Sequence, residues 1–325
     1  MVTLLKSYAL GDMVATYWLN SRNRVVLLLL PNGMNTDHIS KNSESALEYA
    51  SLAHLQLSED SAGMYSNSFK FSETLDKLQY RSITEEADEE TVTVIATEES
   101  DEHFGIRHYL TYHRAEKGVE IHTEFYNHSG RELRLEYLTS VSLDALSPYL
   151  DDDDSRKLVF HRFKAGWSME GLLQSDTLTQ LGLEKAWGFT CESLKLGALG
   201  SRPVRDYHPY GALEDTENKV TWGVYLSHNS SWQMELTRID HSISLSIGLA
   251  ASIFGLWSKR IPDNGSFASP VAYVSVVKGG IAELSNRLLS MRHRAIDAVG
   301  EKDDMAISFN DYIMTWGHPT EEKML

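Results

Sequence analysis

The chain has 325 residues, of which 42% are hydrophobic and 23% are charged, so it is long enough to bury one large core or two smaller ones. Its formal charge of −16 repels nucleic-acid phosphates and anionic lipid headgroups, which excludes nucleic acid and membrane surfaces as expected partners. The single cysteine, Cys191, forms no internal disulfide and no zinc motif, and this suits a reducing, cytoplasmic compartment.

The beginning of the chain carries no targeting or membrane pattern. Residues 1–11 lack the order of basic, apolar and small residues that a secretory signal requires. The longest apolar run, Val25 to Leu30, is six residues long, against about 20 for a membrane helix. We therefore expect a soluble protein.

Alternation of apolar and polar residues dominates the middle of the chain. In residues 119–125 the odd positions are mainly apolar, as in a half-buried strand. The turn-like residues 114–118 predict that 106–113 pairs with this strand as a hairpin. Short turns and little intervening helix predict a mainly β protein, a large antiparallel sandwich. Further strands are predicted at 91–97, 134–143, 158–167, 219–227, 232–238 and 242–247.

A helix is predicted near the end of the chain. Apolar residues recur there at steps of three and four, and Arg287 is expected on the far side of the helix. Residues 300–304 resemble a connector, 307–309 a short strand, and 321–325 the start of another helix. The apolar stripe of the first helix consists of Ile281, Leu284, Leu288 and Met291.

Two kinds of residue could carry sugar chemistry. The segment 200–215 combines Pro and Gly with Arg, Asp, His and Tyr, which can bind sugar hydroxyls and ring faces. An Arg205–Asp206 salt link and buried tyrosines explain the segment equally simply, and we favour that alternative. The tryptophans at 222, 232 and 257 could stack against sugar rings or pack in the hydrophobic core. Strand alternation favours the core.

No cofactor is indicated. His103, His108 and His113 look like a metal set, but on one strand the middle residue points away from the other two, so no metal site is expected. The catalytic motifs of serine hydrolases, zinc proteases and nucleotide-binding proteins are missing from the sequence. No pair of carboxylates is marked out as a glycosidase acid and nucleophile, and no catalytic residue is assigned.

Several stretches together resemble the N-terminal part of glycoside hydrolase family 36, the bacterial α-galactosidases. Their order makes the resemblance specific over roughly Leu133 to Leu325, whereas the preceding residues agree only in strand pattern. The stretches are HRFKAGWSMEG from His161, GSRPVRDYHPYGALED from Gly200, VTWGVYLSHNSSWQMEL from Val220, GLAASIFGLWSKRIPDNGSFASPVAYVSV from Gly248, and FNDYIMTWGHPTEEKML from Phe309.

This resemblance implies an enzyme of three parts, a β-supersandwich of the galactose-mutarotase type, a (β/α)₈ barrel and a small sheet domain. We expect the supersandwich, with its closing helix, in residues 1–300. Residues 301–325 would then be a linker and the first strand and loop of a truncated barrel. The two catalytic aspartates of the barrel, which hydrolyse terminal α-galactosides with retention, would lie beyond Leu325. The implied partners are galactoside oligosaccharides and further copies of the chain, as a homo-oligomer.

The resemblance transfers few site residues. The family has Asn-Asn-Trp at the end of its first barrel strand, where the Trp walls the galactose pocket, and this sequence has Asn310-Asp311-Tyr312. Tyr312 keeps an aromatic wall, while Asp311 replaces an amide with a charge. Trp316 lies in the same stretch. His208 and Trp257 lie in sandwich motifs of the family, where packing explains them equally well. These five are the candidate substrate-binding residues.

Two other functions stay open. One is a stand-alone carbohydrate-binding module that uses exposed tryptophans. The other is a sandwich enzyme of the sugar-epimerase type, which needs a histidine acid and a carboxylate base in one cleft. The residues available for that chemistry are His161, His208 or His241 with Glu124, Glu170 or Glu235.

Overall fold

The computed structural model divides the chain into a large unit, Met1–Met291, and a small unit, Arg292–Leu325. It describes the backbone but not the side chains of residues 293–297 and 324. The described residues are 2–34, 47–60, 68–146, 148–149, 155–185, 191–200, 204–240, 242–252, 254–255, 257–297, 310 and 315–324.

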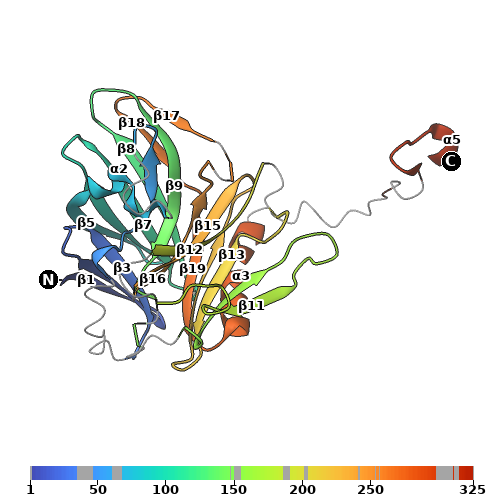
Figure 1. The fold of residues 1–325 in the computed structure, drawn as a ribbon, viewed down its shortest axis with the longest axis horizontal. Helices are drawn as coiled ribbons and strands as arrows, with labels where there is room; N and C mark the ends of the chain where they lie inside the picture. The colour runs from blue at the N-terminus through green and yellow to red at the C-terminus, as the bar shows by residue number, and fades with distance from the viewer. Residues whose placement is uncertain are drawn as a thin grey trace. The chain divides into compact units, whose positions relative to one another are not determined.

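Within these ranges the strands of the large unit form three antiparallel sheets (Figure 1). The first sheet has the order β1-β2-β3, with β1 at Thr3–Leu10, β2 at Met13–Leu19 and β3 at Val25–Pro31. Every residue of β3 is buried, because neighbours cover both of its faces. The apolar run Val25 to Leu30 is therefore a core strand.

The second sheet is the largest and carries the hairpin that matters for the site. Its order is β11-β10-β13-β14-β19-β8-β7-β6-β5, and β18 also pairs with β8, which makes ten strands in the described residues. The bounds are β5 Gln79–Ala87, β6 Thr91–Glu99, β7 Phe104–His113, β8 Val119–Asn127, β10 Leu158–Phe163, β11 Leu173–Thr177, β13 Tyr210–Asp215, β14 Val220–Leu226, β18 Gly265–Ala268 and β19 Ala272–Lys278.

The third sheet has the order β12-β15-β16-β9-β17, with β4 also paired to β9. Residues from all three sheets share one apolar core, so the sheets pack against one another. The bounds are β4 Leu55–Leu57, β9 Leu133–Leu143, β12 Cys191–Ala198, β15 Trp232–Ile239, β16 Ser242–Leu249 and β17 Lys259–Ile261.

Few helices accompany the sheets. The 3₁₀ turn η1 (Phe69–Phe71) and the short α2 (Glu73–Asp76) follow each other, with Ser72 capping α2. The long α3 (Ile281–Asp297) lies against the second sheet, where Leu284 and Leu288 pack on Tyr210 and Tyr273 (Figure 1). A methyl group on Gly223 would overlap Leu284, so this glycine lets α3 approach the sheet. Among the described residues, no helix is long and apolar enough to cross a membrane.

The structure confirms the mainly β, antiparallel prediction. The expected hairpin is β7–β8, and each further strand predicted between residues 91 and 247 has a counterpart within a few residues. Two details were wrong. The strand predicted to reach Trp167 ends at Phe163, because residues 166–171 form the turn that leads back into β11. Arg287 is buried, and its guanidinium binds the Asp12 carboxylate at 2.7 Å.

The small unit contributes α5 (Glu321–Met324) and the turn before it. The strand predicted at 307–309 lies outside the described residues. No closed barrel occurs in the described part of the chain. The start of a barrel at this end stays a prediction.

One buried carboxyl group in the fold makes stability depend on pH. Glu98 of β6 is fully buried, and its Oε1 accepts a hydrogen bond from the Val25 backbone N–H at 2.5 Å. Burial raises the pKa of Glu98 from 4.5 to about 7, although the Val25 N–H and the Arg24 charge oppose that shift. The folded protein therefore holds this proton more tightly than the unfolded chain does.

We predict that this proton stabilises the fold below about pH 4.5 and that the contribution is lost as the pH rises through about 7. Glu98→Gln keeps the acceptor for the Val25 N–H but cannot ionise. The wild type should lose up to about 3 kcal/mol of stability as the pH rises, and this variant should not show that loss. Urea unfolding at pH 5 and pH 8 measures the effect. Glu89→Gln, at an exposed bend, is the control and should keep the pH dependence of the wild type. If stability depends on pH equally in the Glu98 variant and the wild type, the prediction is wrong.

Candidate functional site

The five predicted site residues do not form one site in the described structure. Asp311 and Tyr312 lie outside the described residues. Trp316, in the small unit, is 77% exposed and sits in a left-handed turn with φ 49°. His208 and Trp257 are both half-buried in the large unit, but they border different strands. His208 precedes β13, and its N–H donates to Phe163 of β10. Trp257 contacts Phe267 of β18 at 5.8 Å between ring centroids.

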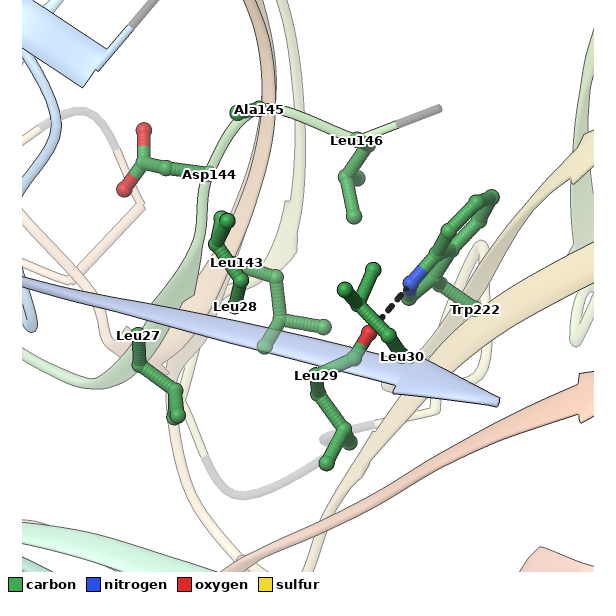
Figure 2. A pocket seen from close by; sticks show the side chains of 9 residues that line it. All are labelled: Leu27, Leu28, Leu29, Leu30, Leu143, Asp144, Ala145, Leu146 and Trp222. Atoms are coloured by element: carbon green, nitrogen blue, oxygen red, sulfur yellow. Dashed lines mark hydrogen bonds between the residues drawn. The ribbon is translucent and has the colours of Figure 1, made fainter. Parts of the chain in front are cut away.

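The tryptophans considered as sugar platforms are mostly core. Trp222 and Trp232 are 1% and 0% exposed, so the core alternative is confirmed for both. Figure 2 shows Trp222 beside a cavity of about 10 Å³, bounded mainly by leucines of β3 and by residues 143–146. That volume holds at most about one water molecule, so no sugar ring fits in it. Asp144 lines the cavity but turns its carboxylate away from Trp222.

Sequence reasoning missed the most exposed tryptophan among the residues that the structure describes. Trp167 is 93% exposed at the tip of the β10–β11 hairpin, together with exposed Met169 and Leu172. The tip is an ordered turn: the Met169 N–H donates to the Gly166 carbonyl at 2.8 Å, and the Gly171 N–H donates to the Lys164 carbonyl at 2.9 Å. The clue in the sequence was the Gly-Trp-Ser-Met-Glu-Gly turn, which interrupts the alternation of β10.

Segment 204–210 lies along this hairpin. The Ala165 N–H donates to the Asp206 carbonyl at 3.0 Å, and the His208 N–H donates to the Phe163 carbonyl at 3.0 Å. Two stretches that carry the family resemblance, 161–171 and 200–215, are thus neighbours in space. Together with β11 they form the candidate site, which we call the hairpin site.

One face of the hairpin site carries a cationic and aromatic group. Lys164 Nζ donates to the Tyr207 hydroxyl at 2.8 Å and lies 4.3 Å from the centre of its ring. Arg162 binds the Asp176 carboxylate at 2.7 Å. Burial raises the pKa of Tyr207, but the hydrogen bonds and charges of Lys164 and Arg162 outweigh it, so the pKa lies below 10.0. The Tyr207 side chain is therefore half-buried, and its hydroxyl is polarised by the charges of Lys164 and Arg162.

The opposite face carries a serine, a histidine and a glutamate in a row. His161 of β10 faces Ser175 of β11, and its Nδ1 lies 2.8 Å from the Ser175 hydroxyl. The other ring nitrogen, Nε2, lies 2.9 Å from Oε2 of Glu214 on β13. The His161 side chain is 7% exposed and Glu214 is 22% exposed, whereas Ser175 is exposed. Burial lowers the pKa of His161, and Glu214 opposes that shift.

The rest of segment 200–215 is mainly structural. Tyr210 is buried, stacks edge-on against Phe163 at 5.0 Å, and shares a hydrogen bond of 2.9 Å with Ser285 of α3. This agrees with the alternative of buried tyrosines that support the segment. Arg205 and Asp206 are both exposed.

The pairs considered for an epimerase are not joined in the described residues. His161 binds Glu214, which was not among the expected partners. Glu124 instead binds Arg107 at 3.0 Å, and Glu235 is fully buried with Lys195 Nζ 3.5 Å from its Oε1. Glu170 is exposed on the hairpin tip, and His241 lies outside the described residues. No group of three or more His, Cys, Asp or Glu that could hold a metal ion occurs in the described ranges.

No protein-family model matches the sequence. No curated protein matches it either. Solved structures do share its fold. The family 36 α-galactosidase AgaA from Geobacillus stearothermophilus, in complex with stachyose, matches 98% of this chain with a TM-score of 0.66 and 12% identity, over 47% of its own length.

Two further structures agree. An α-galactosidase from Lactobacillus brevis has a TM-score of 0.62 and 12% identity, over 90% of this chain and 42% of that one. The galactosidase domain of the α-galactosidase-sucrose kinase AgaSK has a TM-score of 0.63 and 12% identity, over 86% of this chain and 41% of that one. The chain therefore spans less than half the length of these enzymes. At this identity the likeness confirms the expected resemblance in fold.

Proposed function

We propose that this chain is the non-catalytic N-terminal supersandwich of an α-galactosidase-like glycoside hydrolase, and that it supports substrate positioning and subunit assembly for the hydrolysis of terminal α-galactosides. The observation that carries the proposal is the shared fold, which covers 86–98% of this chain but only 41–47% of the matched enzymes. Two AgaA structures contain raffinose and stachyose, which supports galactoside oligosaccharides as the substrate class.

In this proposal residues 1–300 are the supersandwich, and 301–325 are a linker and the beginning of the catalytic barrel. The division of the chain into unit Met1–Met291 and unit Arg292–Leu325 supports a separate part at this end, and it falls within α3, nine residues before the proposed boundary. Asp311, Tyr312 and Trp316 would then line the galactose pocket of the barrel, and the catalytic aspartates would belong to the rest of the enzyme. We place the enzyme in the bacterial cytoplasm, in carbohydrate metabolism.

The hairpin tip supports a role in assembly or substrate positioning. Trp167, Met169 and Leu172 expose apolar surface on an ordered turn. Water contact with such a cluster is unfavourable, so exposed apolar clusters commonly mark binding surfaces. His208 and Tyr207 at the base of the hairpin supply polar groups of the kind that bind sugar hydroxyls.

We expect the purified chain to contact galactosides without transforming them. Saturation-transfer NMR with raffinose should show transfer to the galactosyl protons, while the spectrum of α-galactose should change no faster than in buffer. Trp167→Ala should weaken the transfer, and Trp257→Ala, at a half-buried ring, should change it less. Absence of transfer would remove substrate positioning from the proposal, and accelerated exchange of the galactose anomers would replace it with the epimerase-type function.

A further inference from the structure

The arrangement of Ser175, His161 and Glu214 has a chemistry of its own. An ionised carboxylate can only accept hydrogen bonds, so the 2.9 Å contact with Glu214 requires a proton on His161 Nε2. In the neutral imidazole the lone pair then lies on Nδ1, which faces the Ser175 hydroxyl at 2.8 Å. The Ser175 hydroxyl is therefore the donor of this hydrogen bond, and His161 Nδ1 is the acceptor.

Two features hold Glu214 and His161 in these roles. The Glu214 carboxylate lies beside Gly280, directly before the first turn of α3, which fixes its position next to His161. Burial of His161 lowers its pKa, which favours the neutral imidazole, the form in which Nδ1 can accept a proton. His161 is paired with Ser175 on one side and with Ala212 on the other, and Glu214 lies two positions from Ala212. Because alternate residues of a strand share a face, Ser175, His161 and Glu214 lie on one face of the sheet.

A nucleophile next to a base, with the base oriented by a third group, is the general pattern of an activated serine. We propose that Ser175 is a nucleophile toward small acyl esters, with His161 as general base and Glu214 as the residue that orients it. This reactivity goes beyond the role in α-galactoside hydrolysis and involves neither the barrel nor a galactosidic bond.

The proposed reaction balances within these three residues, ester and water. Ser175 Oγ attacks the ester carbonyl while its proton passes to His161 Nδ1. The bond to the alcohol oxygen then breaks, and His161 returns the proton to the leaving alcohol. Water attacks the acyl-serine in the same way, which releases the carboxylic acid and restores the serine.

The location suits an open site for small substrates. Ser175 is exposed, and β11 is the last strand of the second sheet. Alternate backbone N–H groups of an edge strand point away from its single partner. A backbone N–H that points away from β10 therefore belongs to Ser175 or to one of its two neighbours in β11. It can donate to the negative oxygen that forms when Ser175 attacks the ester carbonyl.

A fluorophosphonate probe tests the proposal on the wild-type chain. We expect covalent labelling of the peptide that contains Ser175, together with slow hydrolysis of p-nitrophenyl acetate. Ser175→Ala should abolish both signals. The control is Ser7→Ala, which removes an exposed serine of the edge strand β1 and should change neither. Labelling only at other serines, or equal labelling of the Ser175 variant, overturns the proposal.

Two further variants separate activation from exposure. His161→Gln should slow labelling about 100-fold, the usual contribution of a general base. Glu214→Gln can still accept from Nε2–H and thus preserve the contact, but it loses the charge, so labelling should slow by about tenfold or more. Circular dichroism of each variant checks the fold. Equal rates in folded Glu214→Gln and wild type would show that Ser175 is merely an exposed serine.

Discussion

Lys70→Met is expected to destabilise the protein by about 3–5 kcal/mol, because it leaves a buried carboxylate without its counter-charge. Lys70 of η1 and Asp144, directly after β9, form an ion pair in which both side chains are 0% exposed. Lys70 Nζ also donates to the Ser244 hydroxyl at 2.9 Å. This contact fixes the segment that contains η1 and α2 to the third sheet.

The two halves of the pair should not respond equally. Burial lowers the pKa of Lys70 to about 7, so in Asp144→Ala the lysine can lose its proton and avoid an isolated charge. In Lys70→Met the Asp144 carboxylate keeps hydrogen bonds from the Ser142 hydroxyl at 2.9 Å and the Ser51 N–H at 3.3 Å, but no cation. We therefore expect the lysine variant to be less stable than the aspartate variant near pH 6, where Lys70 with a pKa of about 7 is still charged in the wild type.

Urea unfolding followed by tryptophan fluorescence measures these differences. Lys77→Met is the matched control, since Lys77 pairs with Glu102 at 2.9 Å on the surface and should cost less than about 1 kcal/mol. The double variant Lys70→Met/Asp144→Leu should recover much of the loss, because it removes both charges. A loss below about 1 kcal/mol for Lys70→Met alone would contradict this account of the pair.

Trp222→Ala is expected to cost about 3–5 kcal/mol, the range for removal of a large aromatic side chain from a core. Trp222 of β14 is 1% exposed, and its Nε1–H donates to the Leu29 carbonyl of β3 at 2.7 Å (Figure 2). It therefore joins the second sheet to the first by both packing and a hydrogen bond. The loss of this side chain would enlarge the neighbouring cavity of about 10 Å³.

A second substitution separates the two contributions. Trp222→Phe keeps most of the apolar surface but leaves the buried Leu29 carbonyl without that donor, which should cost about 1–3 kcal/mol. Trp167→Ala is the matched control: its indole is 93% exposed, so stability should change by no more than about 0.5 kcal/mol. Equal unfolding midpoints for the alanine variants of Trp222 and Trp167 would contradict the core role of Trp222.

The sequence predicted those elements whose pattern is local. The β7–β8 hairpin was visible because its strands alternate and a turn joins them. The helix α3 was visible because its apolar residues recur at helical spacing. In contrast, β3 is buried on both faces and shows no alternation. The run Val25 to Leu30 was therefore recognised only as too short for a membrane helix, and no strand was predicted there. The fold itself was predicted through family resemblance, which the solved structures confirm at 12% identity.

The hairpin site could not be predicted because sheet order brings distant residues together. β13 pairs with β10 although β10 starts at Leu158 and β13 at Tyr210, so Glu214 reaches His161 across 53 positions. Ser175 reaches the same ring from β11, a strand too short and polar to stand out in the sequence. Lys70 and Asp144 are likewise 74 positions apart. Without a known strand order, the sequence offers many histidines and carboxylates and no reason to select these.

The central claim is that these residues form a folded sandwich without the reaction centre for galactosides. The most direct measurement is the release of p-nitrophenol from p-nitrophenyl α-galactoside by the purified 325-residue chain, after circular dichroism has shown that the chain is folded. The account predicts release no faster than in buffer, both for wild type and for Ser175→Ala. Turnover that copurifies with the folded chain would contradict it, because hydrolysis of the galactoside would then arise within these residues.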